Sequence, residues 1–275
     1  KSKAEMDEAI DLLGASVFAG SSSVFGSSLT TNFDKVMELM ADITFNPAFN
    51  ADELEKIRKQ ALSGLEQQKE SPDAIASNVS KALAYGLNHP YGEIETVETV
   101  NKITIQDVKK FYNTYWKPNI GYLVFVGDIT TEKAKALATK HFSKWAKGII
   151  PKTEVPFPTT ATKPLIAIVD RPQSVQSNIS IIAPIALKPG EANVIPASIT
   201  ASILGGGASG RLYKNLREAH GFTYGAYSSI SSDKHIGTFS AGASVRNEKT
   251  DSAIGEFFSE FNRIRKQPVG EDEVF

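Results

Sequence analysis

Apolar residues recur at three- and four-residue intervals over much of the chain, which is the spacing of one face of an α-helix. The first run, which includes Met6, Ile10 and Leu13, predicts a helix over residues 3–13 that ends at Gly14. The same spacing predicts seven further helices, at residues 34–44, 52–69, 73–85, 104–115, 131–145, 211–220 and 250–265.

Strands are predicted where small polar and apolar residues alternate, because successive side chains of a strand point to opposite faces. Residues 16–31 alternate in this way around a Ser-rich turn at 21–23, which predicts two antiparallel strands. A second pair of strands is predicted at 222–230 and 236–245. Three more strands are predicted at residues 120–126, 165–169 and 178–183, the first of them buried. The fold class expected from these elements is α+β.

The two halves of the chain repeat one order of elements. In each half a helix ends at a glycine, Gly14 or Gly221, and two Ser-rich strands follow. An asparagine, Asn32 or Asn247, then precedes an amphipathic helix. Between the halves, residues 148–164 hold four prolines and little apolar periodicity, which is typical of an extended linker.

This repeat predicts a tandem of two similar domains, at residues 1–147 and 165–275, joined by the Pro-rich linker 148–164. Each domain is expected to be an antiparallel-rich sheet packed against helices. The chain begins without Met inside a predicted helix and ends in an unfinished segment. We therefore expect an internal piece of a longer protein, in which the first domain lacks its beginning and the second its end.

Composition and charge exclude several classes of function. The 275 residues include 30 Lys and Arg against 31 Asp and Glu, a net charge of −1. This balance offers no basic excess for a phosphate backbone, so nucleic acid is not an expected partner. The longest uncharged stretch near the start, residues 12–33, is rich in Ser and Gly, so we expect no membrane insertion. The absence of Cys excludes thiolate metal sites and disulfides.

The histidines do not predict a metal site within this chain. The four are His89, His141, His220 and His235, and no two of them are three to five residues apart. Zinc sites built on one helix need such a spacing to bring two imidazoles to one face. We expect His89 in a turn and His141 and His235 at the surface or at element ends. We expect no zinc site built wholly within this chain.

A glycine loop at Gly205, Gly206 and Gly207 continues to Gly210 and satisfies the spacing GxGxxG before a helix. The preceding segment 193–204 fits a strand or a helix, so a dinucleotide-binding turn is one interpretation. The second interpretation is a flexible loop that lets the backbone approach a ligand or partner. The elements after the loop favour the second, because a helix and a hairpin follow and no parallel strand does.

Arg217 and Tyr224 form the most informative pair of polar side chains. Arg217 lies in the last turn of a predicted helix and Tyr224 at the start of a strand, with Gly221 between them. A tight turn there would bring both heads to one side. A guanidinium and a phenol both donate hydrogen bonds, so together they suit a peptide carbonyl or the oxyanion it becomes. The alternative is structural: Arg217 complements the helix dipole and Tyr224 packs on the sheet.

Taken together, these segments resemble the pitrilysin-type metallopeptidases, the family that includes mitochondrial processing peptidase. The segments that carry the resemblance are 11–15, 39–43, 46–47, 85–86, 89–92, 123–128 and 205–227. In that family each chain is a tandem of two similar α+β domains. The resemblance implies that Arg217 and Tyr224 hold substrate near a zinc ion across a clamshell or a subunit interface. It also implies that Gly205, Gly206 and Gly207 lie at the inner surface of the chamber.

The zinc chemistry of the family is not matched by this chain. The family's HxxEH motif would precede Lys1, and its third ligand, a glutamate, would fall where this chain has Ser63, Gly64 and Leu65. Neither Ser63 nor Gly64 ligates zinc as a carboxylate does, although a shift of two or three positions would bring in Glu66. The resemblance is therefore to a non-catalytic subunit, with no cofactor of its own and with zinc in a partner or in an upstream segment.

The sequence leaves three functions open. The favoured one is a subunit of a zinc-dependent peptidase that positions a substrate peptide for a catalytic partner carrying HxxEH, with self-association as the alternative to such a partner. The second is a structural or peptide-binding scaffold with no part in hydrolysis. The third is an active zinc peptidase whose HxxEH segment lies upstream. Family members work in mitochondria, cytoplasm and the bacterial envelope, and of these compartments we lean to the bacterial periplasm.

Overall fold

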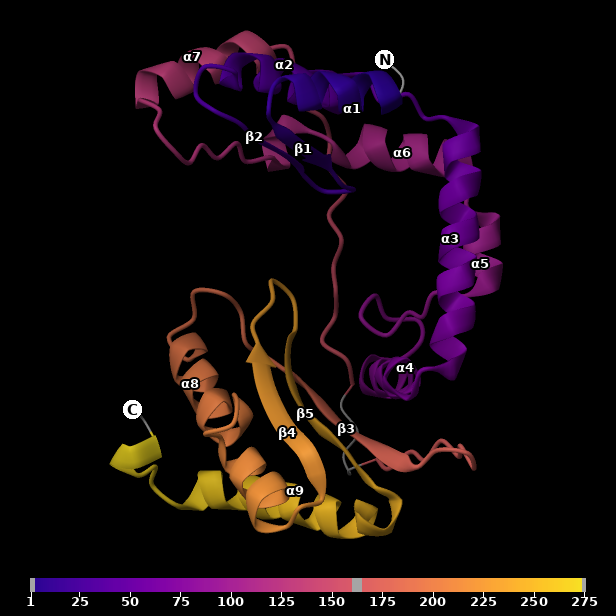
Figure 1. The fold of residues 1–275 in the computed structure, drawn as a ribbon, viewed down its shortest axis with the longest axis vertical. Helices are drawn as coiled ribbons and strands as arrows, with labels where there is room; N and C mark the ends of the chain where they lie inside the picture. The colour runs from indigo at the N-terminus through magenta and orange to yellow at the C-terminus, as the bar shows by residue number, and fades with distance from the viewer. Residues whose placement is uncertain (1–2, 160–164, 274–275) are drawn as a thin grey trace. The chain divides into compact units, whose positions relative to one another are not determined.

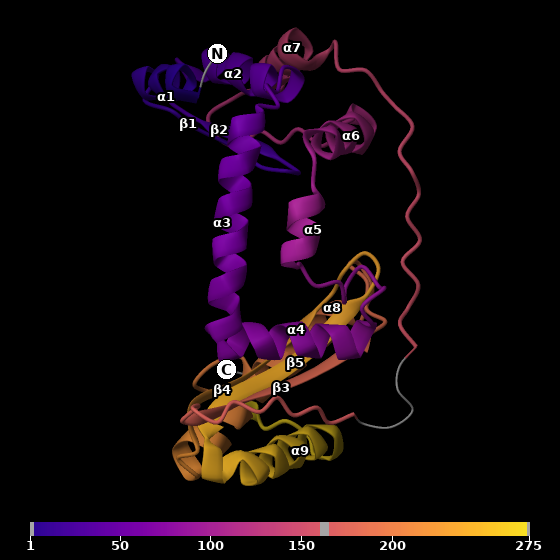
Figure 2. The same cartoon turned by 90° about the vertical axis from the view of Figure 1, so that its right-hand side faces the viewer.

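The computed structural model describes residues 3–159 and 165–273 (Figures 1 and 2). The chain divides into two compact units, each made of two stretches of sequence. Unit 1 comprises Lys1–Gln60 and Glu98–Thr153, and unit 2 comprises Ala61–Val97 and Glu154–Phe275. No helix in the described ranges is long and apolar enough to cross a bilayer.

Unit 1 consists of helices around one short hairpin. Its elements are α1 (Lys3–Leu12), β1 (Ser16–Ala19), β2 (Val24–Ser27), α2 (Phe33–Phe45), the first half of α3 (Ala51–Glu70), α5 (Val97–Lys102), α6 (Ile105–Tyr115), η1 (Pro118–Ile120) and α7 (Thr131–Phe142). β1 and β2 are antiparallel, as predicted, and pair with Phe18 opposite Phe25. The core is formed by Val36, Met37 and Met40 of α2 against Leu137 of α7.

The predicted buried strand at 120–126 is wrong. This segment runs without strand pairing, and the side chains of Tyr122, Val124 and Val126 are 96%, 77% and 93% exposed. Only Phe125 packs on the core of unit 1, where its ring meets Phe33 edge-on. A strand exists only when its backbone N–H and C=O groups bond to a neighbour, and within the described residues no strand lies beside this one. An apolar run shows hydrophobicity but not the presence of a partner strand.

Unit 2 is a three-stranded antiparallel sheet with helices. Its elements are the second half of α3, α4 (Pro72–Tyr85), β3 (Gln176–Ile185), α8 (Val194–Gly205), η2 (Tyr213–Ala219), β4 (Thr223–Ser231), β5 (Gly237–Arg246), η3 (Asn247–Lys249), α9 (Thr250–Lys266) and η4 (Glu271–Glu273). The strand order is β3-β5-β4, so β5 lies in the middle. Residues 148–159 of the predicted linker form no helix or strand, and residues 160–164 lie outside the described residues.

The sheet of unit 2 has one apolar and one polar face, because side chains alternate along each strand. The apolar face packs on α8, η2 and α9, and its core residues are Ile179, Leu204, Leu212, Leu216, Ala226, Ala241, Val245, Ala253 and Phe257. Figure 2 shows α9 and α4 on opposite sides of the sheet. α4 therefore covers part of the polar face, beside β3.

Two further predictions are decided in unit 2. The strand predicted at 165–169 is wrong: the segment is extended but unpaired, with Ile166 and Ile168 more than 80% exposed. The segment 193–204, for which the sequence fits either a strand or a helix, forms the helix α8. The α+β class is confirmed, since separate antiparallel sheets pack against helices in both units.

Candidate functional site

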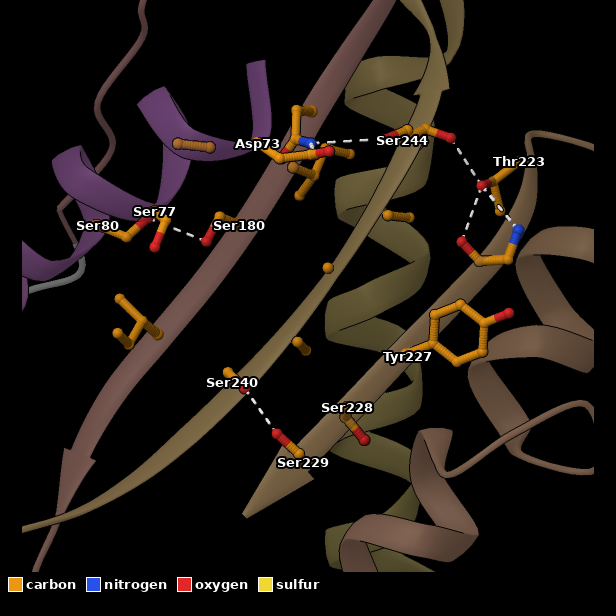
Figure 3. Close-up of a pocket in the computed structure, with 18 of the residues that line it drawn as sticks. Asp73, Ser77, Ser80, Ser180, Thr223, Tyr227, Ser228, Ser229, Ser240 and Ser244 are labelled. Atoms are coloured by element: carbon orange, nitrogen blue, oxygen red, sulfur yellow. Dashed lines mark hydrogen bonds between the residues drawn. The ribbon is translucent and has the colours of Figure 1, made fainter. Parts of the chain in front are cut away.

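The polar face of the unit 2 sheet and α4 enclose an open groove of about 770 Å³ (Figure 3). Small hydroxyl side chains line much of it, namely Ser77, Ser80, Ser180, Ser229, Ser240 and Ser244, whereas the Ser228 hydroxyl is buried and bonded to Ala201 O of α8. Asp73 and Lys81, both on α4, are the charged residues among those described as lining it. A groove with many hydroxyls and few charges suits an uncharged hydrogen-bonding chain better than a strongly charged ligand.

The position of α4 over the sheet is set by its own sequence. Ser71 caps the helix by accepting a hydrogen bond from Ala74 N at 3.3 Å, and Pro72 occupies the first turn, where no N–H is needed. Two pairs then join α4 to β3 across the groove: Asn178 donates to Asp73, and Ser80 Oγ donates to Ser180 Oγ at 3.0 Å (Figure 3). The groove is not predicted by the sequence, in which the Ser-rich strands that line it are its one visible signal.

Tyr224 reaches the groove because β4 contains a β-bulge. Thr223 pairs with Val245 and Ala226 with Ala243, so two residues, Tyr224 and Gly225, face one residue on β5. In a regular strand Tyr224 would share the face of Ala226, which is fully buried in the core. The extra residue of a bulge re-aims the side chain, and Tyr224 is instead 80% exposed and lines the end of the groove.

Arg217 is aimed by a second irregularity, a π-helical turn. In η2 the amide of His220 donates to Asn215 O at 3.1 Å, a five-residue bond that inserts one residue into the helix. Leu216 beside it is fully buried, which holds this turn against the sheet. The helix then ends through Gly221, whose φ of +62° is in the left-handed region that glycine adopts freely.

The two irregular segments bring Arg217 and Tyr224 together. The guanidinium carbon lies 4.8 Å from the centre of the Tyr224 ring, within range of a cation–π interaction. Nη1 of Arg217 also donates to Thr223 O at 3.4 Å. The juxtaposition expected from the spacing of the pair is therefore present. A guanidinium has five N–H donors, so this contact leaves donors for a substrate carbonyl beside the exposed phenol.

The glycine loop has a packing role in this structure. A Cβ on Gly205 would lie 2.5 Å from Ser228 N, so the absence of a side chain lets the end of α8 rest against β4. The dinucleotide interpretation of the loop loses its support, because the element before the loop is a helix and no strand. None of Gly205, Gly206 and Gly207 is among the described residues that line the groove, and their binding role stays a prediction.

The residues present do not fit zinc. Among the described residues, no three His, Asp or Glu side chains gather as metal ligands would. On α3, Ser63 and Gly64 offer no carboxylate, and Glu66 is an exposed side chain paired with Lys69 at 2.7 Å. The open possibility that Glu66 serves as the ligand therefore gains no support.

The histidines serve structural contacts. His89 is buried in a turn, as expected there, and its Nε2 lies 2.9 Å from Pro156 O. His141 lies in the last turn of α7, as expected, but its side chain is only 9% exposed, and its Nε2 lies 2.7 Å from Asp34 Oδ1. Lys140 contacts the same carboxylate, and these two hydrogen bonds lower the pKa of Asp34.

With this geometry in view, comparison with known proteins identifies the class. Residues 102–274 match the family model described as "Peptidase M16 inactive domain", and residues 1–93 match "Insulinase (Peptidase family M16)". The chain belongs to peptidase family M16, which confirms the resemblance to pitrilysin-type metallopeptidases.

The individual relatives agree. The chain is 24% identical over 243 residues to the uncharacterized zinc protease YmxG of Bacillus subtilis, covering 86% of this chain and 58% of that protein. An uncharacterized zinc protease of Mycobacterium tuberculosis is 23% identical over 263 residues, covering 90% of this chain and 58% of that protein. The chain thus spans less than two thirds of the length of these relatives.

Solved structures show the same fold. A peptidase M16 inactive domain from Pseudomonas fluorescens superposes with a TM-score of 0.86 at 23% identity, over 99% of this chain and 67% of that one. A protease from Helicobacter pylori superposes with a TM-score of 0.83 at 20% identity, over 99% of this chain and 68% of that one. The first half of the periplasmic protease PqqL from Escherichia coli superposes with a TM-score of 0.66 at 18% identity, over 97% of this chain and 60% of that one.

Proposed function

We propose that this chain is a non-catalytic part of a zinc-dependent peptidase, in which Arg217 and Tyr224 position a substrate peptide. The observation that carries the proposal is the Arg217–Tyr224 pair, with the guanidinium over an exposed phenol at the end of a neutral groove. Two backbone irregularities converge on this pair, and such features concentrate at functional sites.

The chemistry of the pair supports binding of a peptide carbonyl. Arg217 and Tyr224 donate hydrogen bonds from adjacent positions, which stabilises an oxygen that gains negative charge when the carbonyl is attacked. The groove beside them presents serine hydroxyls, each able to donate to or accept from a peptide backbone. The substrate class proposed is therefore a peptide held in an extended conformation.

The zinc ion is assigned to another part of the assembly, because the described residues of this chain do not fit it. We propose a separate catalytic subunit that carries HxxEH; the alternatives are self-association of this protein and an HxxEH segment upstream in the same protein. The relatives named zinc proteases support an assembly of this class. A bacterial periplasmic location is proposed with it, and one of the similar structures comes from a periplasmic protease.

The proposal is tested on the full-length protein, tagged and isolated from its native host. Copurification of a chain with HxxEH, together with zinc and chelator-sensitive peptide hydrolysis, is the expected result. Arg217→Ala and Tyr224→Phe should then each lower kcat by about a hundredfold to a thousandfold while assembly is unchanged, since each removes a donor to the reacting oxygen.

Tyr122→Phe is the control, because Tyr122 is an exposed tyrosine that does not line the groove. It should keep nearly full activity. Full activity in both Arg217→Ala and Tyr224→Phe would contradict the role of the pair. A protein isolated alone, without zinc and inactive, would favour the structural or peptide-binding scaffold instead.

A further inference from the structure

A buried hydroxyl lies at the β-bulge that carries Tyr224. Thr223 is only 6% exposed, and its Oγ1 accepts a hydrogen bond from Gly225 N at 3.1 Å. The same hydroxyl has two carbonyl acceptors within hydrogen-bond distance, Ser244 O at 2.7 Å and Gly225 O at 2.9 Å (Figure 3). Thr223 thus bonds to Gly225, the second residue of the bulge, and to Ser244, the residue of β5 that faces the bulge.

These bonds replace ones that the bulge disrupts. An extra residue in one strand leaves backbone groups out of register with the neighbouring strand. Threonine is suited to this position, because its hydroxyl can bond a backbone N–H two residues away while its β-branched shape fits a strand. Without the hydroxyl, Gly225 N–H would lose this acceptor, and the bulge that carries Tyr224 would lose bonds that fix its backbone.

The backbone of Thr223 also contacts Arg217. Its carbonyl oxygen accepts the hydrogen bond from Arg217 Nη1 at 3.4 Å. One residue therefore bonds to the guanidinium through its carbonyl and to the Tyr224 bulge through its side chain. Any rotation of the strand at Thr223 moves both of these contacts together.

We infer that Thr223 is a positioning residue, whose buried hydroxyl holds the bulge so that Tyr224 stays under the Arg217 guanidinium. The inference rests on the function proposed above for that pair. A purely structural hydroxyl would affect stability alone, whereas a positioning hydroxyl also changes the surroundings of the Tyr224 ring.

The test uses the full-length protein labelled with 3-fluorotyrosine and observed by ¹⁹F NMR. Tyr224→Phe assigns the Tyr224 resonance, since these 275 residues alone contain eight tyrosines, and Arg217→Met gives its shift without the guanidinium. Thr223→Val, which keeps the shape but not the hydroxyl, should move the resonance toward the Arg217→Met value. Thr223→Ser keeps the hydroxyl and should restore the wild-type shift, and Ser231→Ala, at the far end of β4, should leave it unchanged.

Peptide hydrolysis by the assembled peptidase is measured on the same variants. Thr223→Val should lower kcat/KM by about tenfold to a hundredfold, since a displacement of about 1 Å has effects of this size, and Thr223→Ser should restore activity. An unchanged Tyr224 resonance in Thr223→Val would overturn the inference whatever the activity. A shifted resonance with full activity would leave the inference standing and contradict the proposed function of the pair. If Thr223→Val does not fold, Thr223→Ala takes its place with the same expected shift.

Discussion

Two glycines, Gly64 and Gly205, differ in what surrounds the place of their missing side chain. Gly64 lies within helix α3, and nothing approaches within 4 Å of the position that a Cβ would take. Gly205 lies at the end of α8, where a Cβ would meet the backbone of β4. The two positions therefore respond in opposite directions to the same substitution.

Gly64→Ala should stabilise the protein. The added methyl group meets no neighbour, and alanine reduces the conformational freedom of the unfolded chain. We expect a gain of about 0.5–1 kcal/mol in the free energy of unfolding, measured by urea denaturation. A loss of stability would show that the surroundings of α3 are tighter than the structure indicates.

Gly205→Ala should destabilise the protein by about 1–3 kcal/mol in the same measurement. The new Cβ would overlap Ser228 N, so either α8 or β4 must move. Gly64→Ala serves as the matched control, because it introduces the same atom at an open position. Equal effects of the two substitutions would contradict the packing role assigned to Gly205.

At the scale of elements, the ion pair between Arg211 and Glu273 joins η4 to the turn before η2. Arg211 is nearly buried and meets Glu273 with two parallel hydrogen bonds, of 2.6 and 2.7 Å. The hydrogen bond from Arg211 lowers the pKa of Glu273 to about 2. Such a carboxylate stabilises the folded state above its ordinary pKa of about 4.5, and this contribution disappears as the pH falls toward 2.

Glu273→Gln should therefore lower the free energy of unfolding by roughly 2–3 kcal/mol at pH 7, since it leaves a nearly buried guanidinium without its counter-charge. The difference from the wild type should shrink between about pH 4.5 and pH 2. Denaturant unfolding at a series of pH values checks this. Parallel pH profiles for the two proteins would show that the ion pair contributes no such dependence.

The two hairpins show how far a repeat can be followed from sequence. α1 and η2 each lead into a hairpin through a glycine of positive φ, Gly14 at +54° and Gly221 at +62°. β1 pairs with β2, and β4 with β5, as expected from their alternation. The helices α2 and α9 follow the hairpins, in the order that the sequence repeat indicates. Local signals placed these elements because helix ends and tight turns depend on nearby residues.

At the scale of the whole molecule, contacts distant in sequence hold unit 2 together. Tyr91, in the turn after α4, donates a hydrogen bond to Asp233, in the loop between β4 and β5. Tyr85 bonds Thr238 at 2.6 Å, and His89 bonds the carbonyl of Pro156. The sequence predicts a turn at His89, but nothing local shows that Tyr91 reaches a residue 142 positions away.

The Tyr91 contact predicts a dependence on alkaline pH. The hydrogen bond to Asp233, followed by burial, raises the pKa of Tyr91 to about 12 from its ordinary 10. The neutral phenol therefore stabilises the folded state below about pH 10, and this contribution disappears as the pH rises through about 12. Tyr91→Phe should be less stable than the wild type at pH 7 and should lose this difference between pH 10 and pH 12. Thermal unfolding at these pH values measures the effect, and a constant difference would contradict it.

The predicted domains, 1–147 and 165–275 with the linker 148–164, stay a prediction. The family models match residues 1–93 and 102–274, which is a different division of the chain. Limited proteolysis of the full-length protein, with the ends of the stable fragments identified by mass, would show where the chain opens first. Cleavage within 148–164 is the expected result, because proline-rich extended segments are accessible to proteases.

The sequence by itself determined the α+β class, most helices and hairpins, the family, and Arg217 and Tyr224 as the pair to examine. These depend on local spacing and on motifs, which a single chain displays directly. Only the tertiary structure decided that 120–126 and 165–169 form no strands, because a strand needs a partner that its own residues do not specify. It also decided that a bulge and a π-turn aim the pair, and that α4 faces the serine-lined sheet. Those arrangements arise from packing and backbone bonding between segments far apart in the chain.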